Sequence, residues 1–323
     1  MHIPDGFLDA RTAITTGILS SGSVGLALRR ARKALEPRRI PLVGLTAAFI
    51  FVAQLMNFPV SGGTSGHLVG ATLAAILAGP WAAILMMTNV LLIQAFLFAD
   101  GGVVALGANV LNMAVVAPIV GYAVYRALCL VLPGRRGRLA AASFAAWVSA
   151  VAASLVCGVE LAMSGVAPWT AIVPAMTVVH SVIGLGEGVI TMLVLAAISG
   201  ARPELLDPVL SGDASPRRKY AAAGLAVVAC LILLVIAPFA SSLPDGLESA
   251  ANALGFGGRA VPSALHAPMG GYRLPGSEDA AFVTSLAGGI GAVAAAFLSF
   301  VVARVLVPGR AKSGRAERSG NGE

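Results

Sequence analysis

Histidine occupies the second position of the chain, directly after Met1. With Met1 as the start of the polypeptide, three nitrogen atoms follow one another: the α-amino group, the amide nitrogen of His2 and its imidazole. They can close a five-membered and then a six-membered chelate ring around one small metal ion. A metal that prefers square-planar nitrogen coordination, Ni(II) or Cu(II) above all, suits this geometry. One further nitrogen would complete the plane.

His67 is the candidate for that fourth nitrogen. It is one of four histidines and closes a glycine-rich stretch, Ser61-Gly-Gly-Thr-Ser-Gly-His67, between two apolar runs. We therefore take His2 and His67 as the chemical centre of the molecule. The residues alone leave two plainer interpretations open, in which His2 is a chance residue on a frayed terminus and the stretch before His67 is a flexible turn.

Residues of the glycine-rich stretch are expected to support such a site. Gly63 and Gly66 would let the loop turn tightly and come close to the N-terminus. Thr64 and Ser65 are placed to hydrogen-bond to groups around the metal and to fix the ring of His67.

Other polar residues lie near the ends of apolar segments or inside them. Asp5 is either a carboxylate acceptor near His2 or, as we favour, the N-cap of the first span. Asn57 and Asn109 are candidate supports for the metal ligands, with interhelical hydrogen bonding as the alternative. Ionisable groups inside the apolar segments are expected to face the protein interior; they are Glu160, His180 and Glu187.

The composition indicates a helical integral membrane protein. Charged residues make up 11% of the chain and hydrophobic residues 57%, with a mean hydropathy of +0.86, whereas soluble domains carry about 25% charged residues. Apolar runs of about 20 residues recur, as transmembrane helices require. The three cysteines show no CxxC spacing, so neither a thiolate metal site nor a disulfide framework is indicated. No basic region precedes the first span, so we expect no cleavable signal peptide.

The apolar runs predict nine membrane segments and a multi-pass protein of the cell inner (plasma) membrane. The third segment is short and ends at Gly79-Pro80, so it is expected to be broken or only partly inserted. The predicted segments are 10–28, 41–57, 67–79, 81–98, 103–126, 139–162, 171–198, 220–240 and 281–306.

Basic residues predict the orientation. Clusters of six, four, four and five lysines or arginines follow the first, fifth, seventh and ninth segments, and only Arg11, Arg259 and Arg273 fall on the other side. The positive-inside rule makes the cluster side cytoplasmic, so the N-terminus is outside and the C-terminus inside. The net charge of +7 thus indicates topology and contact with membrane lipid, not nucleic-acid binding. His2 and the loop of His67 then share the outer side.

The chain divides at a polar linker. We expect a seven-span domain at 1–200, a cytoplasmic linker at 201–219, a two-span domain at 220–307 with an outer loop at 241–279, and a disordered tail at 308–323. The outer loop contains Pro244-Asp-Gly-Leu-Glu248 and one histidine, His266, which we take as a solvated side chain.

Four motifs resemble a known family. MHIPDGFL at the start, FPVSGGTSGHLVG at 58–70, GPWAA at 79–83 and FADGGVVALGANVLNMAVV at 98–116 look like the substrate-binding membrane subunit of cobalt/nickel energy-coupling-factor transporters, the CbiM/NikM family. The 220–306 segment with PDGLE looks like the small two-span N component of the same systems, fused here in one chain.

The resemblance implies a metal-capture function. It implies that the Met1 amine, the His2 amide and imidazole and the His67 imidazole bind Ni(II) or Co(II) as the transported substrate, with nickel favoured. It also implies two ATPase subunits and a coupling transmembrane subunit as partners. This agrees with the lack of a Walker A sequence, so the chain itself is expected to be no enzyme and to need no catalytic cofactor.

Two alternatives remain open. Gly63-Thr-Ser-Gly66 matches the nucleophile turn of a rhomboid-like intramembrane serine protease, with Ser65 attacking and His180 as the base. A stand-alone secondary metal permease would need no partner subunits, but it predicts inverted repeats that are not evident.

Overall fold

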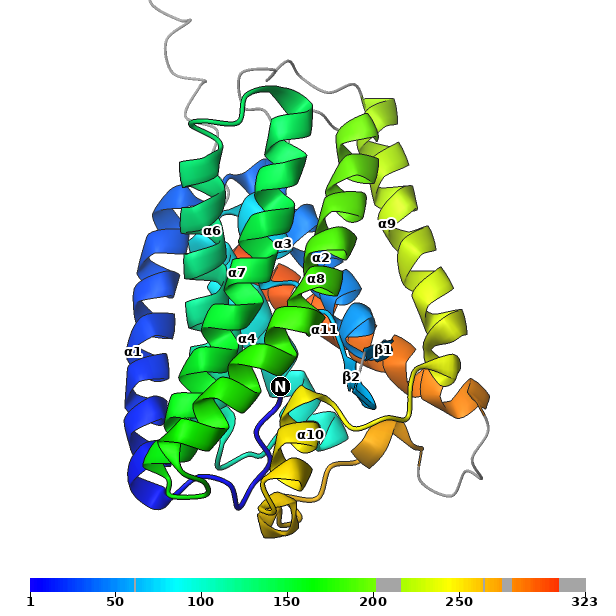
Figure 1. Ribbon diagram of the computed structural model, residues 1–323. Helices are drawn as coiled ribbons and strands as arrows, with labels where there is room; N and C mark the ends of the chain where they lie inside the picture. The colour runs from blue at the N-terminus through cyan, green and yellow to red at the C-terminus, as the bar shows by residue number, and fades with distance from the viewer. Residues whose placement is uncertain (61, 202–215, 264, 275–280, 308–323) are drawn as a thin grey trace, which may run out of the picture.

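The computed structural model describes residues 1–323 except 61, 202–215, 264, 275–280 and 308–323. The described chain forms a bundle of helices with one small hairpin (Figure 1). Residues 202–215 of the predicted linker and the predicted tail at 308–323 lie outside the described residues, whereas residue 201 ends α8 and residues 216–219 begin α9. In chain order the elements of the first part are α1 (Ala10–Ala34), η1 (Pro37–Arg39), α2 (Ile40–Gln54), β1 (Phe58–Val60), β2 (Thr64–Gly66), α3 (Ala71–Ala78), α4 (Pro80–Phe98), α5 (Leu106–Asn109), the π-helix η2 (Val110–Val116), α6 (Ala117–Leu128), α7 (Gly134–Met163) and α8 (Trp169–Ala201).

The second part adds two long helices and, between them, a segment at 240–274 that we call the outer segment after its predicted position. Its elements are α9 (Pro216–Ile236), η5 (Ala237–Phe239), α10 (Gly246–Ala253), η6 (Gly257–Arg259), η7 (Gly270–Tyr272) and α11 (Ala281–Leu306).

Five helical stretches within the described chain are long and apolar enough to cross a membrane. They correspond to α4, the continuous α5–η2–α6, α7, α8 and α11. The short third segment is an eight-residue helix, α3, which ends at Gly79 where Pro80 begins α4. Proline fits the first turn of a helix but lacks the N–H that would continue the preceding one. His67 lies in the loop before α3 and therefore outside the helices.

Helix α1 has the residue distribution of a lipid-facing helix. Its exposed side chains include Ile14, Ile18 and Leu19, whereas Thr16 and Ser20 are buried. Apolar side chains facing outward and small or polar ones facing the protein are expected in lipid, where close packing of helices replaces a hydrophobic core. Asp9 begins α1 by accepting the N–H of Thr12 at 2.9 Å, so the predicted N-cap role of Asp5 is wrong.

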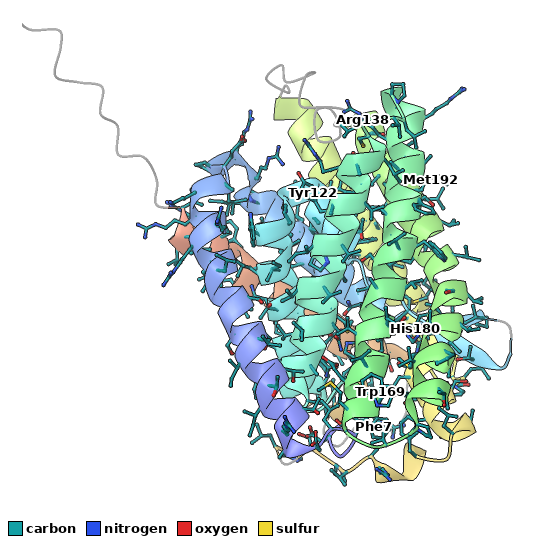
Figure 2. The ribbon with its side chains drawn as sticks, turned by 60° about the vertical axis from the view of Figure 1, so that its left-hand side comes forward. Phe7, Tyr122, Arg138, Trp169, His180 and Met192 are labelled. Atoms are coloured by element: carbon teal, nitrogen blue, oxygen red, sulfur yellow. The ribbon has the colours of Figure 1, made fainter. Side chains whose placement is uncertain are left out.

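Four labelled side chains identify the two ends of the bundle. Arg138 and Tyr122 lie at one end, and Phe7 and Trp169 lie at the other (Figure 2). The N-terminus enters the bundle from the second end, where the β1–β2 hairpin and α10 also lie (Figure 1). Segments from the start, the middle and the last third of the chain therefore meet there.

The second part of the chain packs into the same bundle. Helix α11 crosses α2 so closely that a Cβ on Gly44 would lie 3.0 Å from the carbonyl oxygen of Ala296. On the neighbouring helix α4, Asn89 donates a buried hydrogen bond to Ser299 at 3.1 Å. The outer segment before α11 is consequently held against the first part, beside the N-terminus.

Candidate metal centre

The first residues of the chain are buried and fixed. Met1 is 3% exposed and Ile3 is fully buried. Asn109 holds the backbone of Ile3 on both sides, since its Oδ1 accepts the Ile3 N–H at 2.8 Å and its Nδ2 donates to the Ile3 carbonyl at 3.1 Å. The terminus is thus not frayed, and Asn109 holds the residue that follows His2.

Asp5 fixes the same segment from the other side. Its carboxylate accepts backbone N–H groups of Val103, Val104 and Ala105 at 3.2, 2.8 and 3.3 Å. These groups open the turn before α5, where N–H groups have no helical partner. Asp5 therefore anchors the N-terminal segment and contacts backbone, not His2.

The Met1 amine and the His67 imidazole meet directly. The amine nitrogen lies 3.2 Å from His67 Nε2, and the rings of His2 and His67 stack with centroids 5.1 Å apart. Nitrogens at neighbouring corners of a square around a metal lie about 3 Å apart when metal–nitrogen bonds are about 2.0–2.1 Å long. The separation of amine and imidazole therefore suits two neighbouring ligands.

Each imidazole has an acceptor at the nitrogen that would not bind metal. His67 Nδ1 lies 3.1 Å from the carbonyl oxygen of Leu68, and His2 Nε2 lies 3.2 Å from Oε1 of Gln94. A proton on each of these nitrogens leaves the lone pairs on His67 Nε2 and His2 Nδ1. Metal-binding histidines are commonly fixed in this way. His2 Nδ1 is also the nitrogen that a six-membered ring with the His2 amide requires.

A chain of side-chain amides links the two histidine segments. Gln94 of α4 accepts from His2 and donates through Nε2 to Oε1 of Gln54 at 2.7 Å. Gln54 in turn donates to the carbonyl oxygen of Val69 at 2.8 Å. Because Val69 follows His67 by two residues, this network fixes the two rings relative to each other.

Two carboxylates lie beside the donor group, by which we mean the Met1 amine, His2 and His67. Asp245 accepts a hydrogen bond from the Met1 amine at 2.7 Å, and Asp100 lies 3.5 Å from His2 Nδ1. Burial acts to raise the pKa of Asp245, but the positive amine outweighs it and holds this pKa well below its usual range. Burial likewise acts to raise the pKa of Asp100, but His2 and the hydrogen bond from the Tyr272 hydroxyl at 2.6 Å outweigh it and lower this pKa. Both groups are therefore anionic.

Burial also controls His67. Together with the positive charge of the Met1 amine, it lowers the pKa of His67 to about 3. The ring is consequently neutral at physiological pH, which a metal ligand requires.

The hairpin that precedes His67 was not predicted as strands. Val60 pairs with Thr64 across a turn in which Gly62 and Gly63 have φ of +88° and +72°, a conformation suited to glycine. Gly66 lies against α8, where a Cβ would come 2.5 Å from the side chain of Ile183. The glycines thus allow the segment that ends at His67 to pack closely against α8.

Thr64 and Ser65 do not fix the ring of His67 as predicted. The Thr64 hydroxyl donates to the Pro244 carbonyl at 3.0 Å, and the Ser65 hydroxyl donates to the Leu243 carbonyl at 2.7 Å. Both side chains therefore attach the hairpin to the outer segment before α10. The serine-protease alternative fails for the same reason, since the Ser65 hydroxyl is committed to backbone carbonyls and His180 Nδ1 faces the Met176 carbonyl at 2.9 Å.

Asn57 and His266 lie outside the donor group. The backbone carbonyl of Asn57 accepts the N–H of Ser241 at 2.8 Å, whereas its buried Oδ1 has no hydrogen-bond partner among the described residues. His266 is exposed on the outer segment. Nor do three or more His, Cys, Asp or Glu side chains converge to hold a metal anywhere in the part of the chain that the structure describes.

Glu187 of α8 anchors the segment after His67. Its two carboxylate oxygens accept backbone N–H groups of Val69 and Gly70 at 2.6 and 2.8 Å. These groups stand at the N-terminal end of α3, where a carboxylate is favourable. His180, about two helical turns earlier on α8, lies in the same half of the bundle as Phe7 (Figure 2). A cavity of about 10 Å³, the size of one water molecule, separates these groups; its lining includes Met1, His67, His180, Glu187 and Asp245.

We expect Glu187→Gln to lower the free energy of unfolding by about 1–3 kcal/mol, because the new amide presents a donor to a backbone donor. Metal binding should also weaken, since the segment of His67 loses an anchor. Thermal unfolding and metal titration measure the two effects. Glu160→Gln is the matched control, because buried Glu160 accepts its hydrogen bond from the Asn112 side chain at 2.6 Å and not from the backbone after His67. Metal affinity that is unchanged in Glu187→Gln would contradict the anchoring role.

Two family models cover most of the chain. Residues 2–205 match the family described as cobalt uptake substrate-specific transmembrane region, and residues 219–307 match the PDGLE domain.

Curated relatives agree with these matches. The chain is 39% identical over 306 residues to a putative fused nickel transport protein NikMN of Archaeoglobus fulgidus, covering 94% of this chain and 98% of that protein. It is 37% identical to the fused nickel transport protein NikMN of Rhodobacter capsulatus, covering 73% of each. The cobalt transport protein CbiM of Sorangium cellulosum is 34% identical, covering 64% of this chain and 95% of that protein.

A solved structure resembles the first part. The crystal structure of a truncated transition metal transporter has 34% sequence identity and a TM-score of 0.57. The match covers 62% of this chain and 99% of that chain. The helical transmembrane fold predicted from the sequence is thereby confirmed.

Proposed function

Because the chain belongs to the cobalt uptake substrate-specific transmembrane family and carries a PDGLE domain, we propose that it is the substrate-capture subunit of an ATP-driven transition-metal importer. It binds Ni(II), or Co(II), at the outer face of the membrane and delivers the ion inward. The observation that carries this proposal is the approach of the Met1 amine to His67 Nε2 at 3.2 Å, with the ring of His2 stacked on that of His67.

The ligand set is a plane of four nitrogens. The Met1 amine, the His2 amide and His2 Nδ1 take three successive corners through the two chelate rings. His67 Nε2 takes the fourth corner, between the amine and the His2 imidazole and opposite the amide. This order requires the amine and His67 to be neighbours, which the short distance between them supports. A nitrogen plane favours Ni(II), whereas Zn(II) prefers a tetrahedron and Mg(II) prefers oxygen ligands.

The charges around the site suit an exchange of protons for metal. With both imidazoles neutral and no metal bound, the Met1 ammonium and the two carboxylates, Asp245 and Asp100, give a local charge of −1. Ni(II) binding removes one proton from the ammonium and one from the His2 amide. The divalent ion, the amidate and the two carboxylates again give −1. Replacement of two protons by Ni(II) therefore leaves the net charge of the buried site unchanged. This limits the free-energy cost of burying the ion.

The remaining assignments complete the proposal. The 1–200 domain binds the metal, the linker at 201–219 is cytoplasmic, and the 220–307 domain covers the site from outside. The protein lies in the cell inner membrane with its N-terminus outside. Hydrolysis of ATP belongs to two separate ATPase subunits, and a coupling transmembrane subunit connects them to this chain. Co-purification with these subunits separates the proposal from a stand-alone permease.

Calorimetric titration of the purified full chain with Ni(II) tests the proposal. We expect about one ion per chain and, from buffers of different ionisation enthalpy, release of about two protons per ion. Mg(II) is the control and should give no saturable binding. Absence of saturable Ni(II) binding, or binding without proton release, would show that the amine and amide are not ligands.

A further inference from the structure

The five residues Pro244-Asp-Gly-Leu-Glu248 lie directly on the proposed metal site. The Pro244 carbonyl accepts the backbone N–H of Ser65 at 2.8 Å, which joins this motif to the hairpin before His67. Asp245 accepts from the Met1 amine at 2.7 Å. The motif and α10 lie next to the N-terminus in the bundle (Figure 1). The second part of the chain thus contributes a charged side chain to a site otherwise built by the first part.

The direction of the Asp245 carboxylate is set by α10. Its Oδ1 accepts the N–H groups of Leu247 and Glu248, each at 2.8 Å, as the N-cap of this helix. Glu248 in turn accepts the Asp245 N–H at 3.0 Å and completes a capping box. With Oδ1 committed to the helix, Oδ2 points at the Met1 amine.

The rest of the motif holds α10 in place. Leu247 is 1% exposed. A Cβ on Gly246 would come 2.8 Å from the imidazole of His180, so only glycine allows the helix to approach α8 this closely. Every residue of the motif therefore has a role in placing one carboxylate oxygen beside the amine.

The amine needs such a partner in order to bind metal in a fixed direction. It can rotate about the bond between its nitrogen and Cα, and a coordinated amine still carries two N–H groups. A hydrogen bond from one of them to Asp245 Oδ2 stops this rotation. The lone pair of the nitrogen then faces the space between His67 Nε2 and the His2 ring.

We propose that Asp245 is a positioning residue that orients the α-amino ligand of Met1, so that the PDGLE domain is part of the high-affinity metal site. The proposal rests on the proposed function. It gives a physical reason for carrying both domains in one chain. Asn109 and Asp5 of the first part fix the backbone around His2, whereas the carboxylate that orients the amine comes from the second part.

Asp245→Asn in the full chain tests this role. Asparagine is an equally good N-cap and keeps the oxygen that serves α10, but its amide group cannot accept from the amine. We expect Ni(II) affinity to fall about 10–100-fold, as for other groups that orient metal ligands. With Cu(II) as a spectroscopic probe, electron paramagnetic resonance should change from one four-nitrogen species to a mixture with fewer nitrogens.

Glu248→Gln is the matched control, because it weakens the same capping box without touching the amine. It should keep the wild-type affinity and the four-nitrogen spectrum. Equal loss of affinity in both variants would reduce Asp245 to a structural residue of α10 and overturn the proposal. Wild-type affinity and spectrum in Asp245→Asn would overturn it as well. A wild-type chain that fails to bind Ni(II) through nitrogens would instead refute the proposed function itself.

Discussion

Two glycine residues placed ahead of Met1 are expected to abolish high-affinity Ni(II) binding. The extension turns the terminal amine into an amide and moves it away from His67 Nε2, so the chelate loses its first donor. The folded chain also leaves no space for added residues, because Met1 is 3% exposed and its amine is paired with Asp245. We expect a loss of at least about a thousandfold in affinity, or ~4 kcal/mol. Calorimetric titration of the purified chain measures it.

The control for this prediction is a pair of cleavable fusions. One is cut directly before Met1 and the other leaves the two glycines in place. The products differ only at the terminus, so binding in the first and not in the second locates the effect at the amine. Equal affinity in the two products would exclude the amine as a ligand.

The length of the extension matters. A single added residue would place His2 third from the new terminus. The new amine, two amides and the His2 imidazole would then form a four-nitrogen set of their own, without His67. Binding by such a chain would not bear on the proposed site, whereas two added residues remove both arrangements.

The architecture could be predicted from composition and spacing because the bilayer restricts it. Apolar runs of about 20 residues have few alternatives to helices in lipid, and the Gly79-Pro80 break forecast the short α3 correctly. The β1–β2 hairpin escaped prediction because Phe58–Val60 and Thr64–Gly66 are three-residue strands. Segments that short carry no detectable alternation.

The meeting of the proposed ligands followed from chelate geometry, but the residues around them did not. Gln94 and Glu187 could be recognised only as polar groups in apolar helices, and their partners depend on how the helices pack. Asp100 follows α4 at the start of the motif quoted for 98–116, but its approach to His2 cannot be read from that motif. Asp245 stood in a recognised motif, so the signal for it existed. Its contact with Met1 spans 244 residues and needs the fold.

Two local predictions failed for a common reason. The sequence favours Asp5 as the cap of α1, yet Asp9 lies closer to the first helical turn and accepts from Thr12. Ser65 was expected near the ring of His67, yet its hydroxyl binds the Leu243 carbonyl. In both cases a buried backbone group from a distant segment was available, and such groups must be paired. The linear sequence does not show which distant backbone groups will pair with these side chains.

Replacement of His67 by alanine is the second change with a large expected effect. The Met1–His2 chelate keeps three nitrogens, but the fourth corner passes to water or to a carboxylate. We expect Ni(II) affinity to fall by about 100- to 1,000-fold, or ~3–4 kcal/mol. The visible absorption of a planar four-nitrogen Ni(II) complex should shift, because oxygen is a weaker ligand. Titration and the absorption spectrum measure the two effects on one sample.

A loss caused by the missing nitrogen can be separated from a loss of fold. The ring of His67 is 93% buried beside an existing small cavity, so His67→Ala leaves a space that free imidazole can enter. Added imidazole should restore part of the affinity and the original spectrum, which it would not do for a misfolded chain. Ser154→Ala is the control, since Ser154 of α7 is also buried but its hydroxyl donates within its own helix, to the Val151 carbonyl at 2.8 Å. It should bind Ni(II) as the wild type does. A His67→Ala chain with wild-type affinity and spectrum would remove His67 from the ligand set, and the metal plane would then need another fourth donor.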